Sequence, residues 1–115
     1  MFKYGLSFKI FMDDAPHAFF GSGPATLLQY IEETQSISKA ARHMNMAYSK
    51  AIAIIRRAEA AIGEPLIDAK TGGAGGGGAQ LTEKAKQLLT AYQQCLDELE
   101  GHAGQLFNHR IRPNL

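Results

Sequence analysis

The 115-residue sequence has only one cysteine and no tryptophan, and it has no long apolar run. The single cysteine, Cys95, cannot form an internal disulfide, which fits a reducing compartment and predicts a cytoplasmic protein. The N-terminus alternates between apolar and polar residues instead of forming the apolar block of a signal peptide. Apolar runs fall far short of the ~20 residues that cross a bilayer. These absences argue against a disulfide-stapled scaffold and against a membrane protein.

The sequence also lacks the residue patterns of catalytic and metal centres. Its four histidines and Cys95 are too widely spaced for a zinc site. There is no Ser-His-Asp order and no pair of catalytic carboxylates. The glycine run ends in Gly-Ala-Gln, without the lysine and hydroxyl residue of a phosphate-binding loop. We therefore expect no enzymatic activity, no bound metal and no cofactor.

Net charge is low, at +1, but the basic residues are unevenly placed. Between residues 36 and 82 there are twice as many basic as acidic side chains, namely Lys39, Arg42, Lys50, Arg56, Arg57 and Lys70 against Glu59, Glu64 and Asp68. The local field over a surface, and not the total charge, governs association with phosphate. The distribution predicts moderate, salt-dependent affinity for nucleic acid at this segment.

Residues 36–62 have the pattern of a helix-turn-helix. Ser36 or Ser38 can cap a short first helix. The small pair Ala40-Ala41 permits close approach where two helices cross, and Asn45 tolerates the positive φ of a sharp turn. A second helix follows from about Ala47, with Ala51, Ile55, Ala58 and Ile62 as its core stripe and Gly63 as its end. An ordinary antiparallel helix pair is the alternative.

Residues 65–81 predict a wing, with Leu66-Ile67 and Gln80-Leu81 as paired strands around residues 71–79. A glycine-rich tip can approach DNA closely and offer backbone amides to phosphate. A flexible linker is the compositional alternative.

In a helix-turn-helix, the start of the second helix reaches base edges and later basic residues reach phosphates. We accordingly expect Tyr48, Ser49 and Lys50 to contact bases or sugars and Arg56 to contact phosphate, whereas Arg57 can also bond within the domain. The basic residues could instead serve solubility alone. The complete predicted DNA-binding set is Ser38, Tyr48, Ser49, Lys50, Arg56, Arg57, Lys70, Thr71, Gly75 and Gly76.

The N-terminal region alternates with period two from Phe2 to Met12, passes turn residues 13–17, and returns over residues 18–20. This predicts a β-hairpin over residues 1–20. A first helix then begins near Pro24, a position that tolerates a missing N–H, and extends to Thr34.

Thr82 can cap a long helix over residues 82–107, with lower regularity after Glu100 because of Gly101 and Gly104. Heptad-like spacing predicts a dimer seam, and Leu89 and Leu96 fall beside it, where they can pack on the domain. Cys95 is expected to be a small buried apolar residue. The alternative is a helix that packs only on its own domain. The predicted interface residues are Leu88, Tyr92, Cys95, Leu99, His102 and Leu106.

These segments together predict one mainly α domain over residues 1–115, a winged helix-turn-helix with small β content. It would comprise the N-terminal hairpin (1–20), three helices (24–62), the wing (65–81) and the dimerisation helix (82–107).

Four stretches of the sequence resemble one family. Leu27-Leu-Gln-Tyr-Ile-Glu-Glu-Thr-Gln-Ser-Ile-Ser-Lys-Ala-Ala41, Met44-Asn-Met-Ala-Tyr48, Gly63-Glu-Pro-Leu66 and the run over residues 71–82 are similar to the N-terminal DNA-binding domain of ModE-type, molybdate-dependent transcriptional regulators. That domain is a winged helix related to the DNA-binding part of LysR-type regulators. The resemblance covers about residues 2–100, and the glycine-rich wing is its most specific part.

The resemblance implies a homodimeric transcription factor that binds a near-palindromic operator in double-stranded DNA. The family's DNA-facing segment corresponds to residues 47–50 and its wing to residues 70–79. Ala47 stands where the family often has serine, and Ile52 where it often has tryptophan. Asp68-Ala69-Lys70 replaces a strand that is often richer in arginine. No stretch of this sequence corresponds to the family's molybdate-binding domains, so a separate sensor protein is an expected partner.

The sequence thus predicts a dimeric repressor of molybdate-related or metal-uptake genes. One alternative is a dimeric interaction module that modulates another regulator without strong DNA binding of its own. Another is a small-ligand sensor with a cavity under the N-terminal hairpin.

Overall fold

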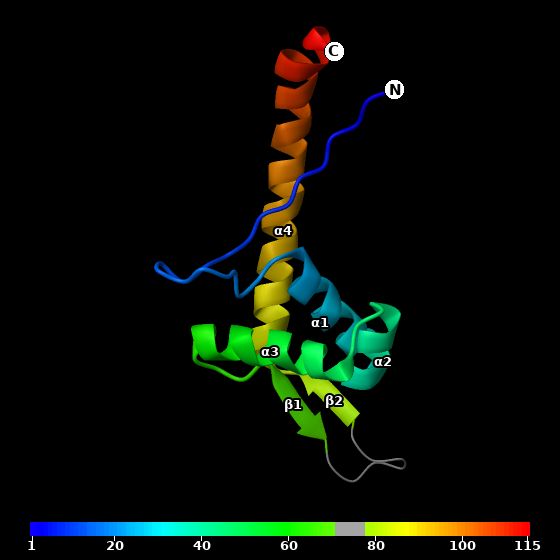
Figure 1. Ribbon diagram of the computed structural model, residues 1–115, viewed down its shortest axis with the longest axis vertical. Coiled ribbons are helices and arrows are strands. Elements are labelled where there is room, and N and C mark those ends of the chain that lie inside the picture. The colour runs from blue at the N-terminus through cyan, green and yellow to red at the C-terminus, as the bar shows by residue number, and fades with distance from the viewer. Residues whose placement is uncertain (71–77) are drawn as a thin grey trace.

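The computed structural model describes residues 1–70 and 78–115. Three helices form a compact base, a two-stranded wing lies against it, and a long helix projects away from it (Figure 1). The molecule is elongated, with principal extents of 59 × 33 × 24 Å. The elements in chain order are α1 (Ser22–Thr34), α2 (Ile37–His43), α3 (Tyr48–Ile62), β1 (Ile67–Lys70), β2 (Gly78–Leu81), α4 (Glu83–Leu106), a π-helical turn (Phe107–Ile111) and a 3-10 turn (Arg112–Asn114).

Helix α1 begins at Ser22, two residues before the predicted start, so Pro24 lies inside its first turn. Proline is tolerated there because the first amides of a helix have no intrahelical acceptor. The helix ends at Gln35, which takes a left-handed conformation with φ 55°. Ser36 then caps α2, since its Oγ accepts a 3.1 Å hydrogen bond from the Lys39 amide. The structure therefore selects Ser36 over Ser38 as the cap.

The core lies where α1, α2, α3, the sheet and the first half of α4 meet. Leu27 and Ile31 on α1 are completely buried, as are Ala40 on α2 and Ala51 on α3. Alanines at these positions allow the helix backbones to approach closely. The predicted stripe on α3 is confirmed at Ala51, Ile55 and Ala58, whereas Ile62 is only partly buried.

Strands β1 and β2 pair antiparallel, with Ile67 opposite Leu81 and Lys70 opposite Gly78. The sheet is joined to the helices by backbone hydrogen bonds. The Ala79 amide donates to the carbonyl oxygen of Gln35 at 3.0 Å, just after α1. This bond fixes the wing relative to the helix-turn-helix that follows α1.

The prediction of an N-terminal β-hairpin, which rested on the alternation of apolar and polar residues, is wrong. Residues 1–9 form no strand, and the return segment contributes only one antiparallel bridge, between Ile10 and Phe20. The apolar side chains of this segment pack on the long helix instead: Phe8 stacks on Tyr92 with ring centroids 4.6 Å apart, and the Tyr4 ring lies 5.2 Å from that of Phe107. The N-terminal segment runs beside α4 in Figure 1. Its partner is a helix surface, which offers no ladder of backbone groups.

Helix α4 begins directly after Thr82, whose Oγ1 accepts a hydrogen bond from the Ala85 amide, as predicted. It continues through Gly101 and Gly104, so the irregularity expected there is wrong. Gly104 has a packing reason, because a Cβ at this position would lie 2.9 Å from the Tyr4 hydroxyl. That hydroxyl donates to the Glu100 carbonyl oxygen at 2.9 Å. Glycine thus lets the N-terminal segment lie flush on the helix.

Candidate nucleic-acid interface

The turn between α2 and α3 is short and tightly bonded. Asn45 has φ 55°, the positive value that the sequence predicted. The Met46 amide donates to the carbonyl oxygen of Ala41 at 3.0 Å, which closes the turn. Because Ala40, Ala41 and Ala51 are all buried at the helix crossing, α3 is held in one orientation against α2.

This orientation exposes one face of α3. The exposed residues Ser49, Ala53 and Arg56 follow each other at four and three positions, and they lie opposite the buried stripe. Tyr48, which is 55% exposed, and Lys50 flank this face at the start of the helix. The structure therefore brings together four of the predicted contact residues, with the polar tip at the N-terminus of α3 and the arginine two turns further on.

The N-terminus of α3 carries no side-chain cap. Ala47 occupies the N-cap position with extended geometry, φ −66° and ψ 148°, but it has no side-chain oxygen to accept from the first amides. Backbone amides at a helix start attract anions, because they lack intrahelical partners and lie at the positive end of the helix dipole. This end of α3 can therefore hold a phosphate group beside Tyr48 and Ser49.

Helix α2 carries its own cluster of exposed basic side chains, which the sequence did not identify as contact residues. Lys39, Arg42 and His43 are all exposed and together line a shallow surface depression. His43 also stacks on Tyr30 of α1, with ring centroids 5.0 Å apart and 6° between the planes. Their spacing of three and four residues was the available signal, since it places them on one helix face.

Glu59 is a second residue of the site that the sequence did not identify. Its Oε2 accepts hydrogen bonds from the amides of Leu66 at 2.8 Å and Ile67 at 3.4 Å. Glu59 thus ties the second half of α3 to the start of β1. Thr82 makes the matching contact at the end of the wing, where its Oγ1 donates to the carbonyl oxygen of Pro65 at 2.8 Å. Together they fix the wing relative to the exposed face of α3.

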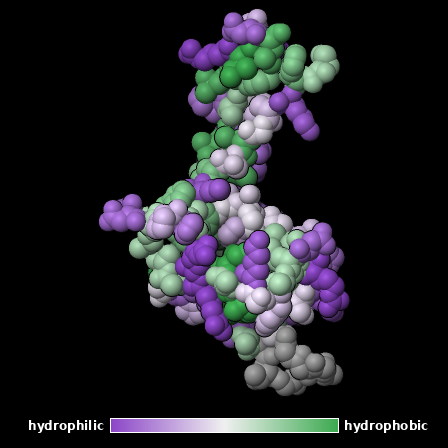
Figure 2. Space-filling model, viewed as in Figure 1, coloured by the Kyte–Doolittle hydropathy of each residue, from purple (hydrophilic) through white to green (hydrophobic). Residues whose placement is uncertain are grey.

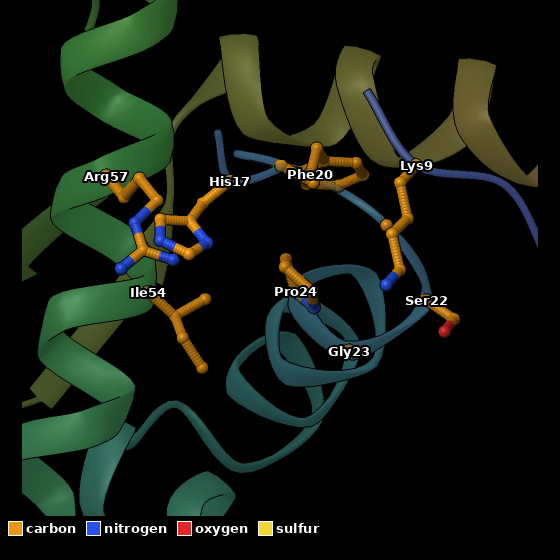
Figure 3. A pocket seen from close by; sticks show the side chains of 10 residues that line it. Lys9, His17, Phe20, Ser22, Gly23, Pro24, Ile54 and Arg57 are labelled. Carbon is orange, nitrogen blue, oxygen red and sulfur yellow. The ribbon is translucent and has the colours of Figure 1, made fainter. Parts of the chain in front are cut away.

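Three further residues of the predicted DNA-binding set, Ser38, Arg57 and Lys70, lie outside the exposed face of α3. Ser38 is exposed on α2, with its Oγ 3.2 Å from that of Ser36. Arg57 is exposed on the flank of α3 and faces a pocket that it shares with Lys9 and His17 (Figure 3). Lys70 is placed by its backbone at the end of β1. The predictions for Thr71, Gly75 and Gly76 lie outside the described residues.

The cations of this surface have no internal counter-ions within the described ranges. The single ion pair found there joins Lys84 to Glu64 at 3.3 Å, and neither residue belongs to α2 or α3. In those same ranges, no cluster of three or more His, Cys, Asp or Glu side chains is arranged to hold a metal ion. Unpaired surface cations are free to meet phosphate.

The predicted seam on α4 needs two corrections. Tyr92 is only 4% exposed, because it packs between Phe8 and Phe20 of its own chain, so it is not available to a partner. Cys95 is exposed on this chain, so the prediction that it is buried is wrong for the single chain. Leu89 and Leu96 pack on the domain core as predicted. Of the remaining predicted seam residues, Cys95, Leu99, His102 and Leu106 are exposed, whereas Leu88 is partly buried against the domain core.

None of the described helices combines the length and hydropathy that a membrane crossing requires. Figure 2 shows green, apolar patches both at the far end of the long helix and over the base. The exposed apolar side chains toward the far end of the long helix and on the N-terminal segment include Phe2, Tyr4, Leu99, Leu106 and Ile111.

Comparison with known proteins agrees with this geometry. Residues 26–86 match the lysR family of bacterial regulatory helix-turn-helix proteins. The chain is 36% identical over 72 residues to the molybdenum-pterin-binding protein MopB of Rhodobacter capsulatus, which covers 63% of this chain and 27% of that protein. It is 34% identical over 87 residues to the transcriptional regulator ModE of Haemophilus influenzae, covering 76% and 34%. For ModE of Yersinia pestis the values are 38% over 66 residues, 57% and 25%.

The chain therefore spans about a quarter to a third of the length of these curated relatives. The matches confirm the resemblance to the DNA-binding domain of ModE-type regulators that the sequence predicted.

Proposed function

The chain belongs to the lysR family of bacterial regulatory helix-turn-helix proteins, and we infer that it regulates transcription by binding operator DNA through α3. The observation that carries this function is the exposed face of α3, where Tyr48, Ser49 and Arg56 are presented by a rigid, alanine-packed turn. A recognition helix reads bases from its N-terminal residues and meets phosphates with later basic residues.

The polar surface continues beyond α3 in both directions. Lys39 and Arg42 on α2 supply cations on one side of the base-reading tip. The wing, fixed by Glu59 and Thr82, approaches the duplex on the other side. A winged helix-turn-helix arranged in this way contacts one major groove and its flanking backbone.

The protein acts as a homodimer through α4. The stripe Leu88, Cys95, Leu99, His102 and Leu106 follows intervals of seven, four, three and four residues, which is the spacing of a helix-to-helix seam. Leu99 and Leu106 are 40% and 42% exposed on a helix that projects from its domain. A two-fold axis along α4 would duplicate α3 and so favour a near-palindromic operator.

The regulatory role is repression of genes for molybdate or metal uptake. Two relatives support the connection to molybdenum by their names, the molybdenum-pterin-binding protein MopB and the molybdenum transport protein ModE of Herbaspirillum seropedicae. We propose a separate sensor protein as the source of the effector signal.

Fluorescence anisotropy with a duplex, titrated over a range of salt concentrations, tests the proposed function. DNA binding predicts that log affinity falls linearly with log salt, with a slope of about −0.9 per neutralised phosphate. An operator selected from random duplexes should bind more tightly than an unselected duplex at each salt concentration. Absence of measurable binding at ~50 mM salt would sink the proposal and favour a dimeric interaction module. The exposed Asp68 on strand β1 of the wing is the feature that would suit such a module.

A further inference from the structure

A pocket of about 280 Å³ lies between the N-terminal segment, the start of α1 and the flank of α3. Three basic side chains from three separate segments line it: Lys9 before the bridge to Phe20, His17 in the connecting turn, and Arg57 on α3. Figure 3 shows Lys9 on one side of the pocket and His17 with Arg57 on the opposite side. The convergence comes from tertiary folding, because Arg57 is far from the other two residues in the sequence.

No acidic side chain is among the residues that line this pocket. Lys9, His17 and Arg57 also make no ion pair and no side-chain hydrogen bond with any other residue that the structure describes. All three side chains are exposed to solvent, so the lining offers an anion the Lys9 ammonium, the Arg57 guanidinium and the His17 imidazole, with no acidic side chain to compete.

Residues 21–24 at the start of α1 complete the lining of the pocket. The Ser22 and Gly23 amides have no intrahelical acceptor because they lie in the first turn, and the N-cap residue Gly21 has no side chain to accept from them. Pro24 follows and has no N–H. A Cβ on Gly21 would lie 3.4 Å from Cγ of Lys9, so the absence of a side chain lets the lysine lie close over the helix start.

We propose that this pocket, formed by Lys9, His17, Arg57 and the first amides of α1, binds a phosphate-type oxyanion. The site is small for an organic ligand, whose pockets usually begin near about 300 Å³, and its donors are cations and amides. Guanidinium and amide N–H groups suit the oxygens of a tetrahedral anion. The anion is either a free ion or a backbone phosphate of a bound duplex, and in both cases the chemistry is the same.

Titration of the full chain with sodium phosphate, followed by ¹H–¹⁵N NMR at constant ionic strength with chloride as the balancing salt, tests the proposal. Saturable shifts of the Ser22 and Gly23 amides are expected. Lys9→Gln and Arg57→Gln should each weaken phosphate binding roughly tenfold, because each removes a charge-assisted hydrogen bond. Lys3→Gln is the matched control: it removes an exposed lysine of the same segment that does not line the pocket, and it should leave the affinity unchanged.

A shift that is linear in phosphate concentration, a shift equal to that caused by chloride, or an unchanged phosphate affinity in both pocket variants would overturn the proposal. Having two variants on different segments keeps the test valid if either one folds poorly. This experiment contains no DNA, so its result is independent of the operator-binding proposal.

A second titration identifies the source of the anion. The affinity for a duplex is measured in phosphate and in chloride of equal ionic strength. If phosphate weakens duplex binding more than chloride does, and Arg57→Gln abolishes the difference, the pocket holds a backbone phosphate. If the two salts act equally on duplex binding while the NMR shifts persist, a free oxyanion is the ligand.

Discussion

The hydroxyl of Tyr92 on α4 donates a 2.9 Å hydrogen bond to the carbonyl oxygen of Phe8, although the two residues are 84 positions apart. Their rings also stack, with centroids 4.6 Å apart. This pair fastens the N-terminal segment to the long helix and covers the Tyr92 ring. Leu99, one heptad further along the same face of α4, is 40% exposed and so remains open to a partner.

Tyr92→Phe should lower the free energy of unfolding by about 1 kcal/mol near neutral pH, because it removes one hydrogen bond and keeps the ring. Chemical denaturation monitored by circular dichroism gives this value. Tyr48→Phe, which removes an exposed hydroxyl, is the control and should change stability little. A loss as small as that of the control would show that the hydrogen bond from Tyr92 to the Phe8 carbonyl contributes nothing to stability.

The stability difference between the wild type and Tyr92→Phe should also depend on pH. Burial raises the pKa of Tyr92, and the nearby Cys95 raises it further. The unfolded chain therefore releases this proton at lower pH than the folded chain does. The stabilisation is present in full below the ordinary tyrosine pKa of about 10, and it is lost as pH rises through the higher folded value. The stability difference between wild type and Tyr92→Phe should accordingly narrow as pH rises above about 10.

Local signals allowed much of the fold to be predicted from the sequence. Ser36, Asn45 and Gly63 act within a few residues of themselves, as cap, turn and helix end, and the structure confirms all three. The alternation of apolar and polar residues in the N-terminal segment led to the wrong prediction of a β-hairpin. A period of two indicates that one side of an extended segment is buried, but it does not indicate whether a strand or a helix covers that side. In this fold the burying surface is Tyr92 and its neighbours on a helix, so no strand partner exists for residues 1–9 among the described residues.

The long-range parts of the site could not be predicted in the same way. Heptad spacing places Tyr92 and Leu99 on the same face of α4, and it cannot tell a residue that faces its own domain from one that faces a partner. Glu59 looks like an ordinary helix carboxylate, since the amides that bond to it lie seven and eight residues away. Arg57 lies beside Arg56 in sequence, but a turn of about 100° along the helix moves it from the exposed face to the pocket flank.

Glu59→Ala should destabilise the wing. The change leaves the amides of Leu66 and Ile67 without their carboxylate acceptor, and we expect a loss of about 1–2 kcal/mol in the free energy of unfolding. Hydrogen exchange at those two amides should rise more than at the core of α1. Glu33→Ala removes an exposed carboxylate from α1 and serves as the control. Unchanged exchange at Leu66 would contradict the role of Glu59 as the tie between α3 and the wing.

Ala47→Ser should stabilise α3. The N-cap backbone is already extended, so a serine hydroxyl can accept from an amide in the first turn without rearrangement. The expected gain is about 1 kcal/mol, the usual value for a serine cap over alanine. Thermal and chemical denaturation measure it, and Ala53→Ser, at an exposed position within the same helix, is the matched control and should not stabilise. Equal effects of the two substitutions would exclude capping as the cause.

Arg56→Gln should weaken duplex binding about equally across DNA sequences, because a phosphate contact carries no base information. It should also reduce the magnitude of the salt slope by about one. Arg110→Gln removes an exposed arginine near the far end of the chain, outside the proposed interface, and should leave the slope unchanged. A loss confined to one operator sequence would instead assign Arg56 to base recognition.

Leu99→Asp should convert the protein to a monomer. Leu99 lies near the middle of the exposed stripe on α4. Dimerisation would bury the new carboxylate against the same carboxylate of the second chain, and burying unpaired charges is strongly unfavourable. Light scattering should then report half the mass of the wild type, and duplex affinity should fall because two linked recognition helices become independent. Gln94→Asp adds the same charge at an exposed position away from the stripe and should remain dimeric. If Leu99→Asp keeps the wild-type mass while Gln94→Asp loses it, the dimer forms through the other face of the helix.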